Sequence, residues 1–346
     1  MIAPLDEMAP HTDAELPALA HALDPKRAAA EVGQAIRPLV PDGAHVTLLE
    51  QRVLAYKARR RCVIAYRFDV RGRAARSSLA VVGKIRARKD GVHAYRQLRS
   101  VWDSGFAVDS GDGISVPEPI GVVPAFGMWL QRSVEGSTLT ALLAGPDGVG
   151  LARRTAEAAH KLHSATIPAI HRHTIADELR ILDRCFAGVA AAMPEAAPRL
   201  VRLADACHRV GAALPAPAWC GSHRDFYSDQ VLVDRTGRLF LIDFDMYCEA
   251  DPGLDVGNFL GHVTELGLRC CGDPRALASV EHALERRFGE LAGESARVAA
   301  RAYAALTVAR HVYLSTRFAD RHRTTASLLD LAERRLLAFT AEGGSA

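Results

Sequence analysis

Two carboxylates and one amide stand close together in the second half of the sequence. The stretch HRDFYSDQ, residues 223–230, places Asp225 five positions before Gln230, and the run RLFLIDFD follows with Asp243 near its end. Phosphoryl transfer from ATP needs one carboxylate that accepts a hydroxyl proton, and a second that holds Mg²⁺ together with an amide oxygen. We therefore expect this chemistry at Asp225, Gln230 and Asp243.

A β-hairpin is predicted to bring these side chains together. The apolar runs VLVD (231–234) and RLFLI (238–242) have strand character, and Thr236-Gly237 between them forms the turn. Such a hairpin places a loop acid and a strand-end acid at one rim of the sheet. A purely structural interpretation stays open, in which Asp225 forms an Asx turn and Asp243 caps the strand.

The first part of the chain has the pattern of an antiparallel sheet. Residues 45–89 are predicted to form three strands, with turns near KARRR and RGRAAR. GVHAYRQLRSVW then has helical spacing, and ISVPEPIGVVPAFGMWLQRSV gives two more strands around a turn at VPAFG. The result is a sheet of about five strands with one helix inserted after the third.

The patterns divide the chain into three parts. Residues 1–40 form a helical N-terminal extension, in which Asp24 is a plausible N-cap. Residues 41–133 form the sheet region, and residues 134–346 are mainly helical apart from the predicted hairpin. The predicted fold class is α+β.

Composition and charge exclude several classes of function. The formal net charge of +3 comes from 43 basic and 40 acidic residues spread along the chain, which indicates no nucleic-acid partner. No signal peptide or membrane-spanning run is present, so no membrane partner is expected. Seven cysteines without a regular framework favour a reduced, cytoplasmic protein, and Cys270-Cys271 with His262 lacks zinc-ligand spacing. The sequence indicates no particular oligomeric state.

Three motifs carry a family resemblance. HRDFYSDQVLVD, GRLFLIDFD and ADPGLDVGNF resemble, in order and spacing, the H-G-D-x-x-x-x-N-V-L-V-D, G-x-L-x-x-I-D-W/F and G-D-P-x-x-D-L-A motifs of the aminoglycoside phosphotransferase and choline kinase family. This family is the small-molecule branch of the protein-kinase-like fold. The resemblance implies a two-lobed structure, with a small antiparallel N-lobe and a larger, mainly helical C-lobe.

The resemblance also implies roles for individual residues. Asp225 would be the catalytic base, and Gln230 and Asp243 would hold Mg²⁺. Lys84 in VVGKIRA would contact the ATP phosphates, although a strand-end lysine is often only solvated. In SVEGSTL, which resembles the family hinge, the adenine pocket would be lined by Arg132 to Val134.

Further residues receive supporting roles. His223 would organise the loop, Asp255 would cap the next helix and brace the loop, and His163 would be a packing residue. Asp245 is either a secondary metal or substrate contact or a solvated carboxylate.

Three features depart from the family pattern, and one is the first hairpin, where YKARRR stands in place of a Gly-rich G-x-G-x-x-G loop. Gln230 stands where the family has Asn and offers the same amide oxygen on a longer side chain. The helix after Lys84 lacks the usual Glu, which leaves Lys84 free or held by another acid such as Glu50.

The expected function is ATP- and Mg²⁺-dependent phosphorylation of a hydroxyl on a small polar molecule, such as an aminoglycoside, sugar or nucleoside. Glu249, Asp251 and Glu265 could form an acidic pocket for a cationic acceptor, but the mixed charges around them do not single out that class. The alternative is a catalytically silent nucleotide-binding pseudokinase with a regulatory role. A protein-serine kinase is disfavoured because the segment between Asp243 and Asp251 is too short for an activation loop.

Overall fold

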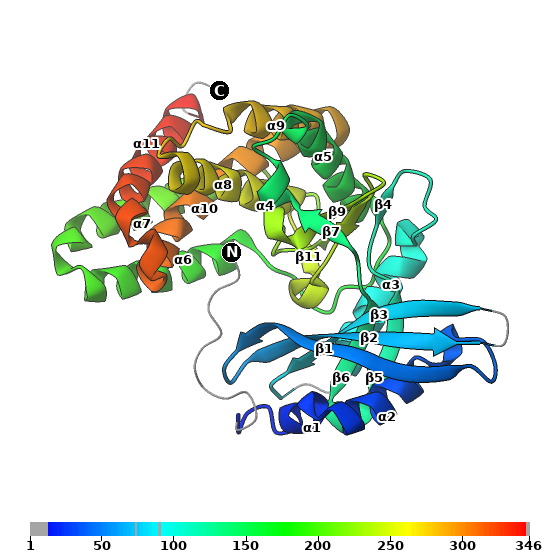
Figure 1. Cartoon of the computed structure of the whole chain (residues 1–346). Coiled ribbons are helices and arrows are strands. Elements are labelled where there is room, and N and C mark those ends of the chain that lie inside the picture. Colours follow the sequence, from blue (N-terminus) through cyan, green and yellow to red (C-terminus); the bar gives the residue numbers. More distant parts are fainter. Residues whose placement is uncertain (1–12, 73–74, 89–90, 344–346) are drawn as a thin grey trace. The chain divides into compact units, whose positions relative to one another are not determined.

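The computed structural model describes residues 13–72, 75–88 and 91–343, and it divides the chain into two compact units. The first unit is Met1–Glu135 and the second is Gly136–Ala346 (Figure 1). Each unit has its own hydrophobic core, so each is described by itself.

The first unit is built on a five-stranded antiparallel sheet in the order β1-β2-β3-β6-β5. Its strands are β1 (His45–Lys57), β2 (Arg61–Arg71), β3 (Arg76–Arg86), β5 (Pro119–Val123) and β6 (Met128–Arg132). A two-residue strand, β4 (Ile114–Ser115), lies outside this sheet, and helix α3 (Val92–Val101) follows β3. The five sheet strands and the inserted helix are those that the sequence predicts.

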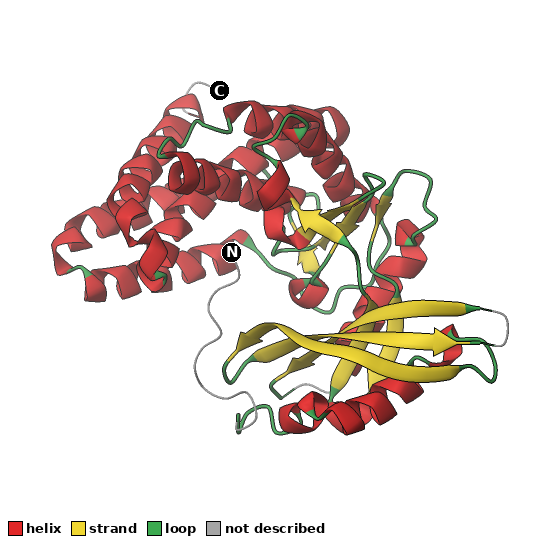
Figure 2. Ribbon diagram, viewed as in Figure 1, coloured by secondary structure: helices red, strands yellow, loops and turns green. Residues whose placement is uncertain are grey.

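Strand alternation explains how this sheet is covered. In β2, Cys62, Ile64, Tyr66 and Phe68 are all buried at two-residue intervals, as expected of one face of a strand. The helices α1 (Leu19–Leu23) and α2 (Pro25–Ala35) contribute to the same core and lie along the sheet in Figure 2. As predicted, Asp24 caps α2, because its carboxylate accepts a hydrogen bond from the amide of Arg27.

The second unit contains two small sheets that carry the motif segments. In one, β9 (Val231–Asp234) lies between β7 (Gly136–Thr138) and β10 (Leu239–Leu241), and β9 and β10 form the predicted antiparallel hairpin. Asp234 accepts bonds from Thr236 and Arg238 in the turn, where Gly237 takes a positive φ of 81°. The other pairs β8 (Cys220–Ser222) with β11 (Cys248–Ala250), and neither strand was predicted.

Helices form the rest of the second unit (Figure 2). They are α4 (Leu139–Leu142), α5 (Gly148–Ser164), α6 (Ile175–Ala192), α7 (Ala197–Ala212), α8 (Pro252–Cys271), α9 (Ala278–Ala292), α10 (Glu294–Arg317) and α11 (Thr325–Gly343). A capping box between Thr174 and Asp177 fixes the start of α6. Within the described ranges, no helix is long and apolar enough to cross a membrane.

Close packing of α8 against α10 depends on small residues. Gly253, Gly257 and Gly261 recur every four residues along α8, so they share one face of the helix. A Cβ atom at Gly257 would lie 2.4 Å from the Cβ of Tyr303 and 2.6 Å from the carbonyl oxygen of Ala300 on α10. The glycine face therefore fixes the position of α8 relative to α10.

Candidate active site

The loop between β8 and β9 carries Asp225 on an unusual backbone. Arg224, directly before it, has a φ of 66°, and Asp243 after β10 has a φ of 68°. Non-glycine residues in this left-handed region cost about 1–3 kcal/mol each and persist where the surrounding contacts hold them. The two strained residues are in the two segments that the sequence predicts to carry chemistry.

Hydrogen bonds from Ile242 bring these two segments together. Its backbone amide donates to the carbonyl of Gln230 at 3.0 Å, and its carbonyl accepts from Nε2 of His223 at 2.9 Å. The amide nitrogen of Gln230 also reaches Oδ2 of Asp225 through a long bond of 3.4 Å. Asp225, Gln230 and Asp243 are therefore brought together in the second unit.

Asp255 holds the loop backbone from the first turn of α8. Its fully buried carboxylate accepts from the amide of His223 at 2.8 Å, from the amide of Arg224 at 2.6 Å and from Nε2 of His163 at 3.0 Å. Burial alone would raise the pKa of Asp255, but the hydrogen bond and charge of His163 and the contacts of His223 hold it below the ordinary value. The carboxylate is thus kept ionised where it fixes the strained residue before Asp225.

Two supporting roles predicted from the sequence need correction. Asp251, not Asp255, caps α8, because its side chain accepts from the amide of Gly253 at 2.7 Å. His163 does more than pack, since it donates to Asp255. Asp245, whose role the sequence leaves open, lies in a 3₁₀ turn, Phe244–Met246. The role of Asp255 as a brace of the loop agrees with its contacts, and His223 is fully buried as expected.

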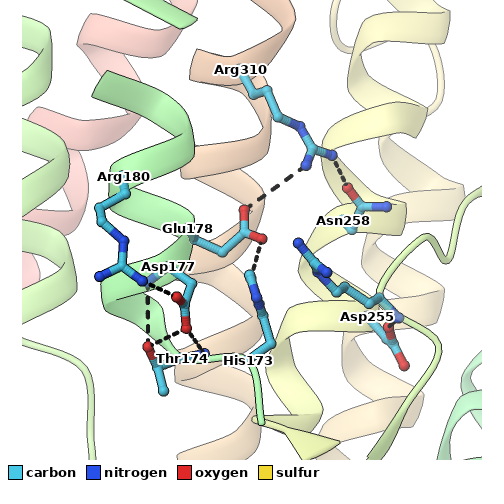
Figure 3. A network of polar contacts seen from close by, with 9 residues as sticks. His173, Thr174, Asp177, Glu178, Arg180, Asp255, Asn258 and Arg310 are labelled. Atoms are coloured by element: carbon cyan, nitrogen blue, oxygen red, sulfur yellow. Dashed lines mark hydrogen bonds and ion pairs between the residues drawn. The ribbon is translucent and has the colours of Figure 1, made fainter. Parts of the chain in front are cut away.

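A polar network that the sequence analysis missed supports the other side of the loop. Asn258 on α8 donates from Nδ2 to the carbonyl of Phe226 at 2.9 Å and accepts from Nη2 of Arg310 on α10 at 2.6 Å. Glu178 on α6 lies 3.9 Å from Nη1 of Arg310 and accepts from Nε2 of His173 at 2.6 Å (Figure 3). Asn258 follows Asp255 by three positions and therefore lies on the same face of α8. This spacing is the one feature of the sequence that could have indicated a role for Asn258 in supporting the loop.

Glu178 is an ionised acid despite its burial. Burial would raise the pKa of Glu178, but the hydrogen bond from His173 and the charges of Arg310 and Arg224 bring it below the ordinary value.

Aromatic rings pack beside the same loop. The ring of Tyr227 stacks on His262 with centroids 4.5 Å apart, and His262 meets His311 edge to face at the same distance. Burial is the main cause that keeps the pKa of both histidines well below the ordinary value; for His262 the neighbouring His311 comes next, and the charges of Arg310, Arg321 and Arg269 lower both further. Both rings are thus neutral and pack beside Tyr227.

The predicted nucleotide contacts belong to the first unit. Lys84 on β3 pairs in register with Trp129 on β6, and its ammonium lies 5.0 Å from the centre of that ring. Arg132 ends β6 and forms an ion pair with Glu118 at 2.5 Å, and Val134 follows outside the strand. Glu50 is not the partner of Lys84 that the sequence suggested, because it pairs with Arg67 on β2, and Arg67 is in register with Ala80 on β3, four residues from Lys84.

The donors at the loop suit a magnesium ion better than a transition metal. Among the described residues, no group of three or more His, Cys, Asp or Glu side chains could hold a metal. Mg²⁺ needs only one or two carboxylates, because phosphate and water oxygens complete its shell. A carboxylate from Asp243 and an amide oxygen from Gln230 are hard ligands of this kind, so the residues present fit Mg²⁺.

Family comparison identifies the chain. The model of the phosphotransferase enzyme family matches residues 106–293, more than half of the sequence. The chain belongs to this family. It is a small-molecule kinase, as the motifs predict. No curated protein matches it significantly.

Solved structures confirm the predicted two-lobed, protein-kinase-like fold. A choline/ethanolamine kinase family protein from Mesorhizobium loti is 17% identical, with a TM-score of 0.58 over 90% of this chain and 98% of that one. Choline kinase from Cryptosporidium parvum is 11% identical, with a TM-score of 0.54 over 90% and 96%. A spectinomycin phosphotransferase solved with ADP and spectinomycin is 11% identical, with a TM-score of 0.53 over 85% and 94%.

Proposed function

We propose that the chain transfers the γ-phosphoryl group of ATP to a hydroxyl of a small polar molecule. The observation that carries the proposal is the convergence of Asp225, Gln230 and Asp243 around Ile242, in a loop whose backbone is held by Asp255. A base and two magnesium ligands held in fixed positions are what the protein contributes to this reaction, because positioning and electrostatics dominate phosphoryl transfer.

The residues act in one balanced step. Asp225 accepts the proton of the acceptor hydroxyl while the oxygen of that hydroxyl forms a bond to the γ-phosphorus of ATP. The bond between the γ-phosphorus and the oxygen that bridges the β- and γ-phosphates breaks, so ADP leaves. Gln230 and Asp243 would hold Mg²⁺, which neutralises charge on the phosphates. Lys84 would contact the ATP phosphates, and the segment from Arg132 to Val134 would contact the adenine.

The seven cysteines are all free, which supports our proposal of a cytoplasmic location.

The decisive experiment is a screen for acceptor-dependent ADP release. Purified full-length protein with ATP and Mg²⁺ is offered amines with hydroxyls, sugars, nucleosides and hydroxy acids. We expect the wild type to turn over at least one acceptor. In Asp225→Asn the rate of ADP release should fall by about 10²- to 10⁴-fold, the usual contribution of a general base. ATP binding by that variant should be unchanged. Tight ATP binding by the wild type with no transfer to any acceptor would instead indicate a nucleotide-binding pseudokinase.

A further inference from the structure

Arg224 is a costly residue at its position. It stands directly before Asp225 and has a φ of 66°, where glycine would fit without strain. Its backbone amide donates to Asp255, but any residue other than proline would supply that donor. The arginine side chain must therefore be explained by something other than the backbone.

The guanidinium of Arg224 is unused within the described part of the chain. It makes no hydrogen bond and no ion pair there, although arginine carries five N–H donors. Its backbone amide is fixed by Asp255, and Asp225 follows it directly in the chain, so the side chain starts beside the predicted base. A charged side chain with unused donors next to the predicted base is available to bind a ligand.

Arg310 adds a second guanidinium with unused donors. It donates from Nη2 to Asn258, its contact with Glu178 is a long ion pair of 3.9 Å, and its buried Nε has no hydrogen-bond partner among the described residues. Its side chain keeps 23% of its surface exposed, so a solute can reach it. Figure 3 shows Arg310 reaching between Glu178 and Asn258.

The buried acids around the two guanidinium groups are already engaged by other donors. Glu178, 3.9 Å from Nη1 of Arg310, already accepts a 2.6 Å bond from His173, and Asp255 accepts from the amides of His223 and Arg224 and from His163. The acids that could have attracted a cationic acceptor are also occupied. Glu249 pairs with Arg172 at 2.7 Å, Glu265 pairs with Arg269 at 2.8 Å, and Asp251 caps α8.

We propose that the acceptor is an anionic hydroxyl compound, and that Arg224, assisted by Arg310, binds its carboxylate or phosphate group while its hydroxyl meets Asp225. This inference rests on the proposed function and specifies its acceptor. Guanidinium groups suit both anions, because their donor geometry matches two oxygens at once. The acceptor class is then hydroxycarboxylates or phosphorylated alcohols, not polycationic sugars.

The test compares acceptor classes and arginine variants in the full-length protein. ADP release is measured with hydroxycarboxylates and sugar phosphates in separate arms, which distinguish the two anions, and with amino sugars, choline and neutral sugars. We expect an anionic acceptor to give the highest kcat/KM. Arg224→Gly should raise its KM about 10- to 100-fold, as expected for losing a hydrogen bond to a charged group. The KM for ATP should not change.

Two variants separate binding from folding. Arg224→Gly relieves a strained backbone, so its Tm should be equal to or above that of the wild type, and lost affinity cannot then be ascribed to misfolding. Arg88→Gly removes an exposed arginine from a similar backbone conformation, with φ 59°, and should leave the acceptor KM unchanged. A cationic or neutral acceptor as the best substrate, or an unchanged KM in Arg224→Gly, would overturn the proposal.

A binding measurement keeps the inference testable if no acceptor is turned over. The absence of turnover would contradict the proposed function, and the anion site would then be tested with inorganic phosphate alone. Phosphate should raise the Tm of the wild type and of Arg88→Gly but not that of Arg224→Gly. An equal rise in all three proteins would show that Arg224 binds no anion.

Discussion

Replacing Asp255 with asparagine tests how the loop before Asp225 is held. The carboxylate accepts three hydrogen bonds at 2.6–3.0 Å with no exposed surface. Asparagine keeps one oxygen but turns an NH₂ group toward at least one of these donors. Removing one member of a buried charged network costs about 3–5 kcal/mol. For a unit of roughly 200 residues we expect the Tm to fall by about 6–20 °C.

Asp251→Asn is the matched control because it changes the same group on the same helix. Asp251 is also buried, but burial raises its pKa, and the one described hydrogen bond to its side chain comes from the amide of Gly253. Asparagine caps helices about as well as aspartate. We expect the free energy of unfolding to change by less than about 1 kcal/mol, or to rise.

Opposite pKa shifts give the two variants opposite pH dependence. The folded pKa of Asp255 is lowered, so its stabilisation is fully present above the unfolded value of about 4 and is lost as the pH falls through the folded pKa. The difference in the free energy of unfolding between the wild type and Asp255→Asn should therefore become smaller below about pH 4. The folded pKa of Asp251 is raised, so the free energy of unfolding of the wild type should increase relative to that of Asp251→Asn as the pH falls toward 4.

Thermal and urea unfolding between pH 3 and pH 8 measure both effects. Equal decreases in the free energy of unfolding of the two variants would show that a buried carboxylate on α8 contributes only through packing. A stable Asp255→Asn with unchanged activity would refute the reasoning that this residue holds the loop.

Two further predictions concern helix packing and the metal. Gly257→Ala should lower the free energy of unfolding by about 1–3 kcal/mol, because its Cβ would overlap α10, whereas Gly150→Ala on α5 meets no atom within 4 Å and should stabilise the protein in the same urea titration. Gln230→Asn shortens the proposed ligand and should change the Mg²⁺ concentration for half-maximal ADP release by about 10-fold or more, while an unchanged Mg²⁺ dependence would remove Gln230 from the ligand set.

Local patterns made much of the fold predictable. Alternation in β2 and the Asp24 cap are encoded within a few residues, as is the turn at Gly237. The pair β8 and β11 was missed because each strand has three residues and its partner lies far along the chain. Three residues are too few for a periodic signal.

The candidate site was predictable only where its residues share a motif. Asp225, Gln230 and Asp243 lie in neighbouring segments joined by one hairpin, so spacing alone pointed to their proximity. Glu178 and Arg310 come from helices on either side of the motif, and the links from Glu178 to Arg310 and from Arg310 to Asn258 arise only through tertiary packing. The assignment of the cap to Asp255 failed because Asp251 and Asp255 both lie in a plausible first turn, and a sequence pattern does not show which side chain reaches the free amide.

The geometry of the loop depends on a distance between helices. Asn258 joins the carbonyl of Phe226 to Arg310, so the loop is tied to α10 through α8. That link keeps its length only while the glycine face of α8 allows the two helices to approach, as at Gly257. Because packed interiors do not deform continuously, a small shift of α10 would move Arg310 and release Asn258. The residues next to the predicted base are therefore positioned by helix packing as much as by the motif itself.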